Sequence, residues 1–162
     1  MSYINPAPGT TNQVVLKLEL ATAANFASAL TVPGMQDVTV NAANDSFTWT
    51  QLDSSAKLQV ATTSTNSIAM NIVLDDTTFF GSNLSSAITD AVALQGIMGL
   101  SRNKTKVKFS LKMVENGVTD RYIQGVGYIT GIAPKVSADQ PVWVSPLTIS
   151  VSGEYTVTAT EA

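Results

Sequence analysis

Residues 104–114 alternate strictly between two kinds of side chain, and this pattern limits the fold more than any other feature of the chain. One set is Thr105, Val107, Phe109, Leu111 and Met113, and the other is Lys104, Lys106, Lys108, Ser110 and Lys112. A period of two is typical of a β-strand with one buried face. Asn116-Gly117 then predicts a tight turn, and residues 121–132 are the expected return strand. The segment therefore predicts an antiparallel sheet.

Further strands are expected on both sides of this hairpin. Residues 13–20 alternate in the same way, and Gly153 is expected to form the turn between the last two strands. The other predicted strands cover 36–41, 57–63, 67–75, 143–153 and 154–160. With about eight or nine strands, the expected fold is mainly β. We expect an antiparallel β-sandwich or partial barrel that carries one α-helix.

One helix is predicted, at about residues 84–98, where apolar residues recur at helical spacing. Ser82 or Asn83 would cap its first turn, and Gly99 suits its end. Before the first strand, residues 1–12 contain Pro6, Pro8 and Gly9 among polar residues. We interpret these residues as an extended N-terminal arm or a frayed terminus, and residues 13–162 as a single domain.

The segment 41–56 combines turn-forming residues with large apolar ones. It predicts an extended hairpin or a long loop between strands. Phe47, Trp49 and Leu52 lie on it and need a surface to bury against, either in the same domain or on a neighbouring copy. We favour a neighbour, and we expect these three residues, with Tyr3 and Ile4 of the N-terminal arm, to form a contact between assembled copies.

Three glycines fall on one face of the predicted strand 121–132: Gly125, Gly127 and Gly131. Glycine weakens an isolated strand, so three on one face predict a bend or the close approach of another backbone. We expect that approach to come from a neighbouring copy or from the predicted helix.

The composition excludes most enzymatic chemistry. The chain has no Cys and no His, so it cannot form a thiol nucleophile, a disulfide, an imidazole base or a histidine-bound metal site. Asp75-Asp76 is the only adjacent acidic pair and has no further oxygen ligands at metal spacing nearby. No apolar run approaches the roughly 18 residues that cross a bilayer. We therefore expect a structural or binding protein with no cofactor and no membrane insertion.

Lys104, Lys106, Lys108 and Lys112 line one face of the alternating strand. Such a stripe could contact phosphates, but it has no aromatic residues on the same face for base stacking. The net charge of −3 also argues against nucleic-acid affinity through bulk charge. We favour a solvated face or pairing with carboxylates of a neighbouring copy, at an interface or along a lumen.

The order of elements resembles that of the major tail tube proteins of long-tailed bacteriophages, a family similar to the tube protein of type VI secretion systems. The likeness is strongest from residue 105 onward, where an aromatic-Gly-x-Val strand leads through a polar link to a strand that ends in Ser-Gly. The matching positions are Tyr122, Gly125, Val126, Ile149, Val151, Ser152 and Gly153. The segment around 35–58 resembles the family's strand and long stacking loop.

This resemblance implies a virion protein that forms rings, usually of six copies, whose strands complete a continuous inner β-barrel. The rings would stack into a tail tube, assembled in the host cytoplasm, through which double-stranded DNA leaves without specific binding. Its partners would be other copies of the chain and tail components such as tape-measure, terminator, baseplate or sheath proteins. Two alternatives remain: a monomeric β-sandwich binding module, carbohydrate-binding or adhesin-like, and a virion decoration protein.

Overall fold

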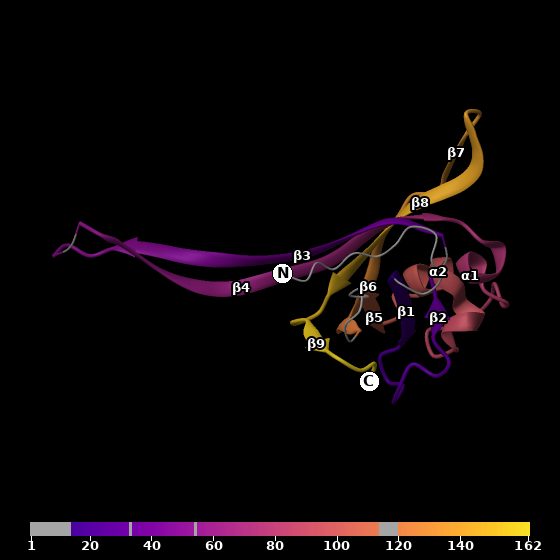
Figure 1. Cartoon of the computed structure of the whole chain (residues 1–162), viewed down its shortest axis with the longest axis horizontal. Helices are drawn as coiled ribbons and strands as arrows, with labels where there is room; N and C mark the ends of the chain where they lie inside the picture. The colour runs from indigo at the N-terminus through magenta and orange to yellow at the C-terminus, as the bar shows by residue number, and fades with distance from the viewer. Residues whose placement is uncertain (1–13, 33, 54, 114–119) are drawn as a thin grey trace.

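In this computed structural model, which describes residues 14–32, 34–53, 55–113 and 120–162, the chain forms one antiparallel sheet and two short helices (Figure 1). The strands are β1 (Val14–Leu20), β2 (Leu30–Thr31), β3 (Met35–Thr50), β4 (Lys57–Val73), β5 (Val107–Met113), β6 (Arg121–Ile132), β7 (Lys135–Ser137), β8 (Gln140–Val151) and β9 (Thr156–Thr158). The helices are α1 (Asp76–Phe80) and α2 (Val92–Arg102).

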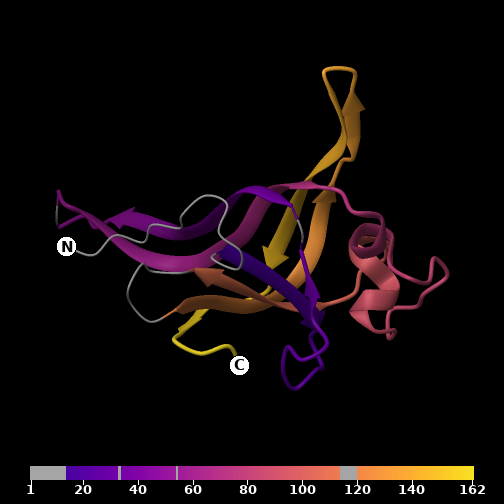
Figure 2. The ribbon, with the colours of Figure 1, turned by 45° about the vertical axis from the view of Figure 1, so that its right-hand side comes forward.

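The main path of the sheet runs β2-β1-β5-β6-β8-β4-β3, while β7 pairs with β8 and β9 pairs with β6. The sheet curves around a core, and the two helices lie beyond one end of it (Figure 2). Among the described strands, β2 and β3 are the edges of the main path, so the sheet is open. The expected mainly β, antiparallel fold is confirmed, and it takes the form of a partial barrel made from one sheet.

The core lies on the face that the alternating pattern predicted. Val107, Phe109 and Leu111 of β5 are at most 1% exposed. In the β1–β5 ladder, Leu16 is opposite Leu111 and Leu18 is opposite Phe109, so both strands turn their apolar residues to the same side. Strand β5 begins at Val107 rather than at 104, because the chain leaves α2 through residues 103–105. The strand expected at 121–132 is β6, and the predicted Asn116-Gly117 turn lies outside the described residues.

The prediction of separate strands around residues 41–66 was wrong. β3 continues to Thr50 and β4 is unbroken from Lys57, so the segment expected as a hairpin or long loop at 41–56 is the far part of one long hairpin. The stretches Asn41–Asn44 and Ser64–Asn66 resemble turns in composition, yet they pair with each other across the hairpin. Backbone ladder bonds, which any residue except proline can make, override their turn preference.

The helix expected at 84–98 was also wrong in its bounds. The observed α2 runs from Val92 to Arg102, with a kink at Gly96, where φ is 65°. Upstream, the Asp90 carboxylate accepts a hydrogen bond from the Ala87 amide at 2.6 Å, and the Asn83 side chain accepts one from the Ser85 amide. Such local bonds compete with helix formation and favour turns. Sequence reasoning also missed α1, which Asp75 caps through the Thr78 amide.

Close approaches inside the chain explain the glycines on the core face of β6. A Cβ at Gly127 would overlap the Ser150 carbonyl of β8, and a Cβ at Gly125 would lie 2.9 Å from the Phe109 ring of β5. At Gly131 the nearest atoms belong to the Thr148 side chain, at 3.2 Å. The atoms nearest to a Cβ at Gly125 or Gly127 belong to β5 and β8, and the expected role of the three glycines between copies stays a prediction.

The C-terminal segment contacts the β3–β4 hairpin near its middle, at Asn41 and Ser67. The Tyr155 hydroxyl lies 2.7 Å from the Ser67 carbonyl oxygen and 2.9 Å from that of Asn41, so its one proton is shared between β4 and β3. The side-chain amide of Asn66 donates a hydrogen bond to the Gly153 carbonyl at 2.9 Å. The Tyr155 ring also packs edge to face on Phe109 of the core. We call Tyr155 and its bonds to β3 and β4 the Tyr155 clamp.

Gly127→Ala should destabilise the fold more than Gly131→Ala. At Gly127 the added methyl meets β8 backbone, which cannot move without breaking the β6–β8 ladder, whereas at Gly131 it meets a side chain. We expect Gly127→Ala to lower the free energy of unfolding by about 3 kcal/mol and Gly131→Ala by about 1 kcal/mol. Urea denaturation of both variants measures the difference, and equal losses would contradict this account.

Tyr155→Phe should keep the ring contact and lose the bonds to the β3–β4 hairpin. We expect the free energy of unfolding to fall by about 1 kcal/mol, since the partly buried Ser67 carbonyl and the exposed Asn41 carbonyl lose their shared donor. Tyr128→Phe is the matched control, because Tyr128 is an exposed tyrosine on β6. Chemical denaturation measures the free energy of unfolding of both variants. An equally large decrease in Tyr128→Phe would contradict a stabilising role of the Tyr155 hydroxyl.

The same clamp should weaken at alkaline pH. Burial raises the pKa of Tyr155 above its usual 10.0. A raised pKa in the folded state means that stability is fully present below about pH 10 and is lost as pH rises through the folded value. We therefore expect wild type to lose more stability than Tyr155→Phe between pH 9 and about 11, measured by denaturation at each pH.

Candidate assembly surfaces

The far part of the β3–β4 hairpin, residues 41–65, projects well beyond the rest of the sheet; we call it the arm (Figure 1). Every described residue of the arm is exposed. The two strands pair only with each other there, because β8 joins β4 from Ser67 onward. The arm is therefore a two-stranded ribbon without a core of its own.

One face of the arm is apolar and the other is polar. Phe47 is opposite Val60, and Trp49 is opposite Leu58. Opposed residues in an antiparallel pair point to the same side, so these four side chains share one face, which we call the apolar face of the arm. The Phe47 and Trp49 rings stack with centroids 5.9 Å apart. The intervening pairs Thr48–Gln59 and Thr50–Lys57 form the opposite face.

This apolar face is only partly covered within the chain. Phe47 is 60% exposed and Trp49 is 38% exposed, although they stack on each other, and Leu52 at the tip is fully exposed. A contiguous apolar patch on an otherwise polar ribbon marks an interaction surface. The sequence singled out Phe47, Trp49 and Leu52, and their expected role in a contact between copies stays a prediction. Leu58 and Val60 became evident only with the register of the hairpin.

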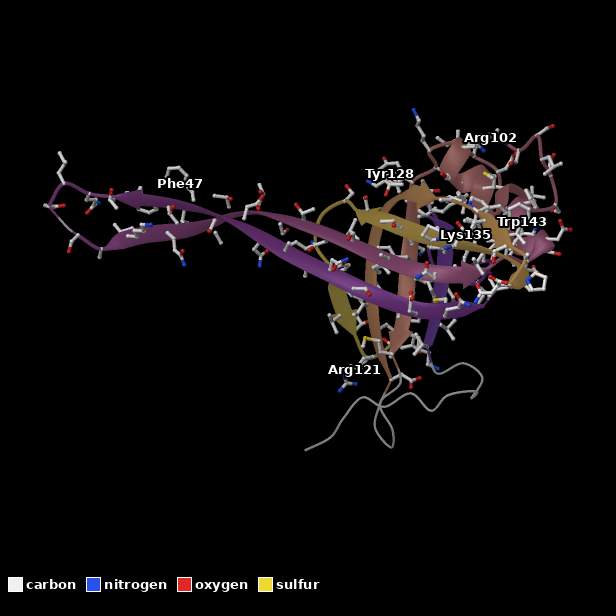
Figure 3. The ribbon with its side chains drawn as sticks, turned by 90° about the horizontal axis from the view of Figure 1, so that it is seen from above. Phe47, Arg102, Arg121, Tyr128, Lys135 and Trp143 are labelled. Atoms are coloured by element: carbon white, nitrogen blue, oxygen red, sulfur yellow. The ribbon has the colours of Figure 1, made fainter. Side chains whose placement is uncertain are left out.

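A second apolar surface lies at the other end of the molecule. Where α1 meets the β7–β8 hairpin, a cleft of about 520 Å³ opens to solvent. Its apolar lining includes Phe79, Phe80, Met98, Pro134, Val142 and Trp143. Trp143 is 53% exposed. Figure 3 shows Trp143 at this end and Phe47 far out on the arm. The lining comes from four distant segments, so the sequence alone did not reveal the cleft.

The four lysines do not form the uniform stripe that the alternation suggested. Lys108 donates to the Ala23 carbonyl at 2.8 Å and lies 4.5 Å above the Phe26 ring. Lys112 pairs with Asp120 at 3.0 Å, and the hydrogen bond that its ammonium group donates to this carboxylate raises the pKa of Lys112. Lys104 and Lys106 are exposed. Two of the four charges are thus engaged within the chain, and a role at an interface or lumen stays a prediction for all four.

The remaining predicted site residues, Tyr3 and Ile4, lie outside the described residues. Within the described part of the chain, no group of three or more acidic side chains is placed to hold a metal ion. Over the same residues, no helix is long and apolar enough to span a membrane. The apolar face of the arm and the cleft are therefore the surfaces that most need an explanation.

No protein-family model matches this chain, and no curated protein matches it. Solved structures do match over nearly its whole length. The tail of an empty gene transfer agent particle, determined with C6 symmetry, has a TM-score of 0.63 at 16% identity, covering 92% of this chain and 98% of that one.

Two further structures have similar folds. The SPP1 tail tube has a TM-score of 0.66 at 13% identity, covering 94% of this chain and 80% of that one. The tube-terminating cap of the anti-feeding prophage has a TM-score of 0.53 at 10% identity, covering 99% of this chain and 97% of that one. The chain therefore has the fold of phage tail tube proteins, as the sequence resemblance implied.

Proposed function

We propose that this chain is a structural virion protein whose copies form rings that stack into a phage-type tail tube, the conduit for DNA ejection. The observation that carries the proposal is the arm, a 25-residue ribbon (41–65) whose apolar face the described residues cover only in part. The likeness of its fold to the SPP1 tail tube supports the same reading. A structural role, rather than an enzymatic one, follows from it.

Open sheet edges support assembly into rings. Among the described strands, β3 pairs with β4 alone, and β2 pairs with β1 over only two residues, so much of the outer side of β1 has no described strand beside it. Unpaired edges are hazards unless another strand covers them. Pairing between neighbouring copies would cover both and close a larger barrel. Six copies per ring is the natural expectation, since the gene transfer agent tail has C6 symmetry.

The low charge of the chain suits a channel for DNA. Only 13% of residues are charged, and the net charge is −3. Double-stranded DNA carries one negative charge per roughly 1.7 Å, so a strongly basic wall would hold it in place. We propose that DNA passes without specific binding, in a tube located in the virion and assembled in the host cytoplasm. The cap-like neighbour supports contacts with other tail components such as terminator, tape-measure, baseplate or sheath proteins.

Negative-stain electron microscopy of the purified protein tests the proposal. We expect rings or rods with a central channel at high protein concentration. Size-exclusion chromatography on the same sample should show species much larger than the 17.0 kDa monomer. A sample that stays monomeric at every concentration would overturn the proposal and favour a binding module.

Trp49→Ala should weaken assembly without unfolding the chain. Trp49 lies on the arm, away from the core, so we expect little change in the unfolding transition. Loss of a buried aromatic anchor typically costs about 2 kcal/mol per contact, roughly thirtyfold in an association constant. Rod length and the concentration at which rods appear are the measurements.

The matched control is Thr48→Ala, because Thr48 is the adjacent residue on the polar face of the arm. We expect it to assemble like wild type. If Trp49→Ala and Thr48→Ala gave rods of the same length and threshold, the apolar face of the arm would have no part in assembly.

A further inference from the structure

We propose that the cleft between α1 and the β7–β8 hairpin is the receptor for the apolar face of the arm of a second copy. This inference rests on the proposed self-assembly and adds to it the partner surface for the arm. Both are apolar surfaces that the described residues leave open to solvent.

The cleft has the chemistry that the arm needs. Phe79, the most buried of its lining residues, forms the apolar floor, while Phe80 and Trp143 are substantially exposed at its sides. Its volume of about 520 Å³ lies within the range of pockets that hold bulky ligands. On docking, the apolar face of the arm would leave water and pack against these aromatic and aliphatic side chains; the residues involved are Phe47, Trp49 and Leu58.

A chain cannot fill its own cleft with its own arm. The arm and the helices lie at opposite ends of the long axis of the molecule (Figure 1). Figure 3 shows the same separation between Phe47 on the arm and Trp143 at the cleft. The Tyr155 clamp fixes the base of the arm, so the arm does not fold back. An arm that docks in the cleft therefore comes from another copy.

Charges near the two surfaces are complementary. Lys57 is exposed on the arm, directly before Leu58. Asp75 and Asp76 lie at the rim of the cleft. The Asp75 carboxylate caps α1 through Thr78, whereas Asp76 is exposed in the first helical turn. Lys57 belongs to the polar face of the arm, one residue from Leu58, so the arm carries a positive charge near its apolar face that is opposite in sign to the acidic rim of the cleft.

A projection at one end and a receptor at the other make a head-to-tail contact. Contacts of this kind do not saturate in a dimer but continue from copy to copy, into closed rings or open filaments. The contact would therefore repeat along the tube axis, while the sheet edges on the sides of the molecule remain free for neighbours within a ring.

Cross-linking between single-cysteine chains tests the inference. The chain contains no Cys, so each introduced thiol is unique. We would mix Leu58→Cys chains with isotope-labelled Val142→Cys chains, assemble them, and oxidise the sample or treat it with a short bismaleimide. Mass spectrometry then identifies peptides joined between a labelled chain and an unlabelled chain.

We expect abundant cross-links between residues 58 and 142 of different chains. Gln59→Cys replaces Leu58→Cys in the matched control, because residue 59 is adjacent but belongs to the polar face. We expect its cross-links to residue 142 to be at least tenfold fewer. Val157→Cys, exposed on β9 and not part of the cleft lining, replaces Val142→Cys in a second control.

The outcomes separate this inference from the proposed function. Rods of wild type in which residues 58 and 142 do not cross-link, or cross-link no better than the controls, would overturn the inference and leave the tube intact. Wild type that never assembles would overturn both.

A charge reversal provides an independent readout. Lys57→Glu should weaken assembly about two- to fivefold per contact, the size of an exposed ion pair, and more strongly at low salt. Adding Asp76→Lys should restore it, because the pair is then reversed rather than lost. If the double variant assembled no better than Lys57→Glu alone, Lys57 would not lie at the rim of the cleft.

Discussion

The described residues leave much of the apolar face of the arm exposed to solvent, and the rest of the structure holds this face in a fixed position. A two-stranded ribbon is at best marginally stable in water, and strands of 16 and 17 residues far exceed the usual five or six. The stacking of Phe47 on Trp49 reduces the exposed apolar area only in part. Burying apolar surface contributes about 25 cal/mol of stabilising free energy per Å² removed from water. Association with another copy would therefore stabilise the arm directly.

The rest of the fold holds the arm in one direction. Tyr155 binds carbonyls of both strands at the arm's base and packs on Phe109, which lies in the centre of the core. Gly125 leaves the room that the Phe109 ring occupies. Residues on four strands and the C-terminal segment therefore determine where the arm points. A ribbon held this way loses less conformational freedom on docking than a flexible loop would, which favours affinity.

Sequence patterns predicted the parts of the fold in which burial alternates. β1, β5 and β6 agree with the expected strands because one of their faces is buried along most of its length. The arm lacks that signal because all of its described residues are exposed, and only cross-strand backbone pairing reveals Asn41–Asn44 and Ser64–Asn66 as strand. The helix was misplaced because the Asp90 and Asn83 side chains bond to nearby amides in place of a helical turn.

The same contrast applies to the candidate surfaces. Phe47 and Trp49 could be singled out because they are aromatic residues in a polar segment, but the cleft forms only when α1, α2 and the β7–β8 hairpin meet. The described molecule thus has unsatisfied backbone edges along its sides and unsatisfied apolar surfaces at its two ends. In the proposed tube, hydrogen bonding would act within a ring and apolar burial between rings. Because the two contacts use different forces, either could be weakened by mutation while the other persists.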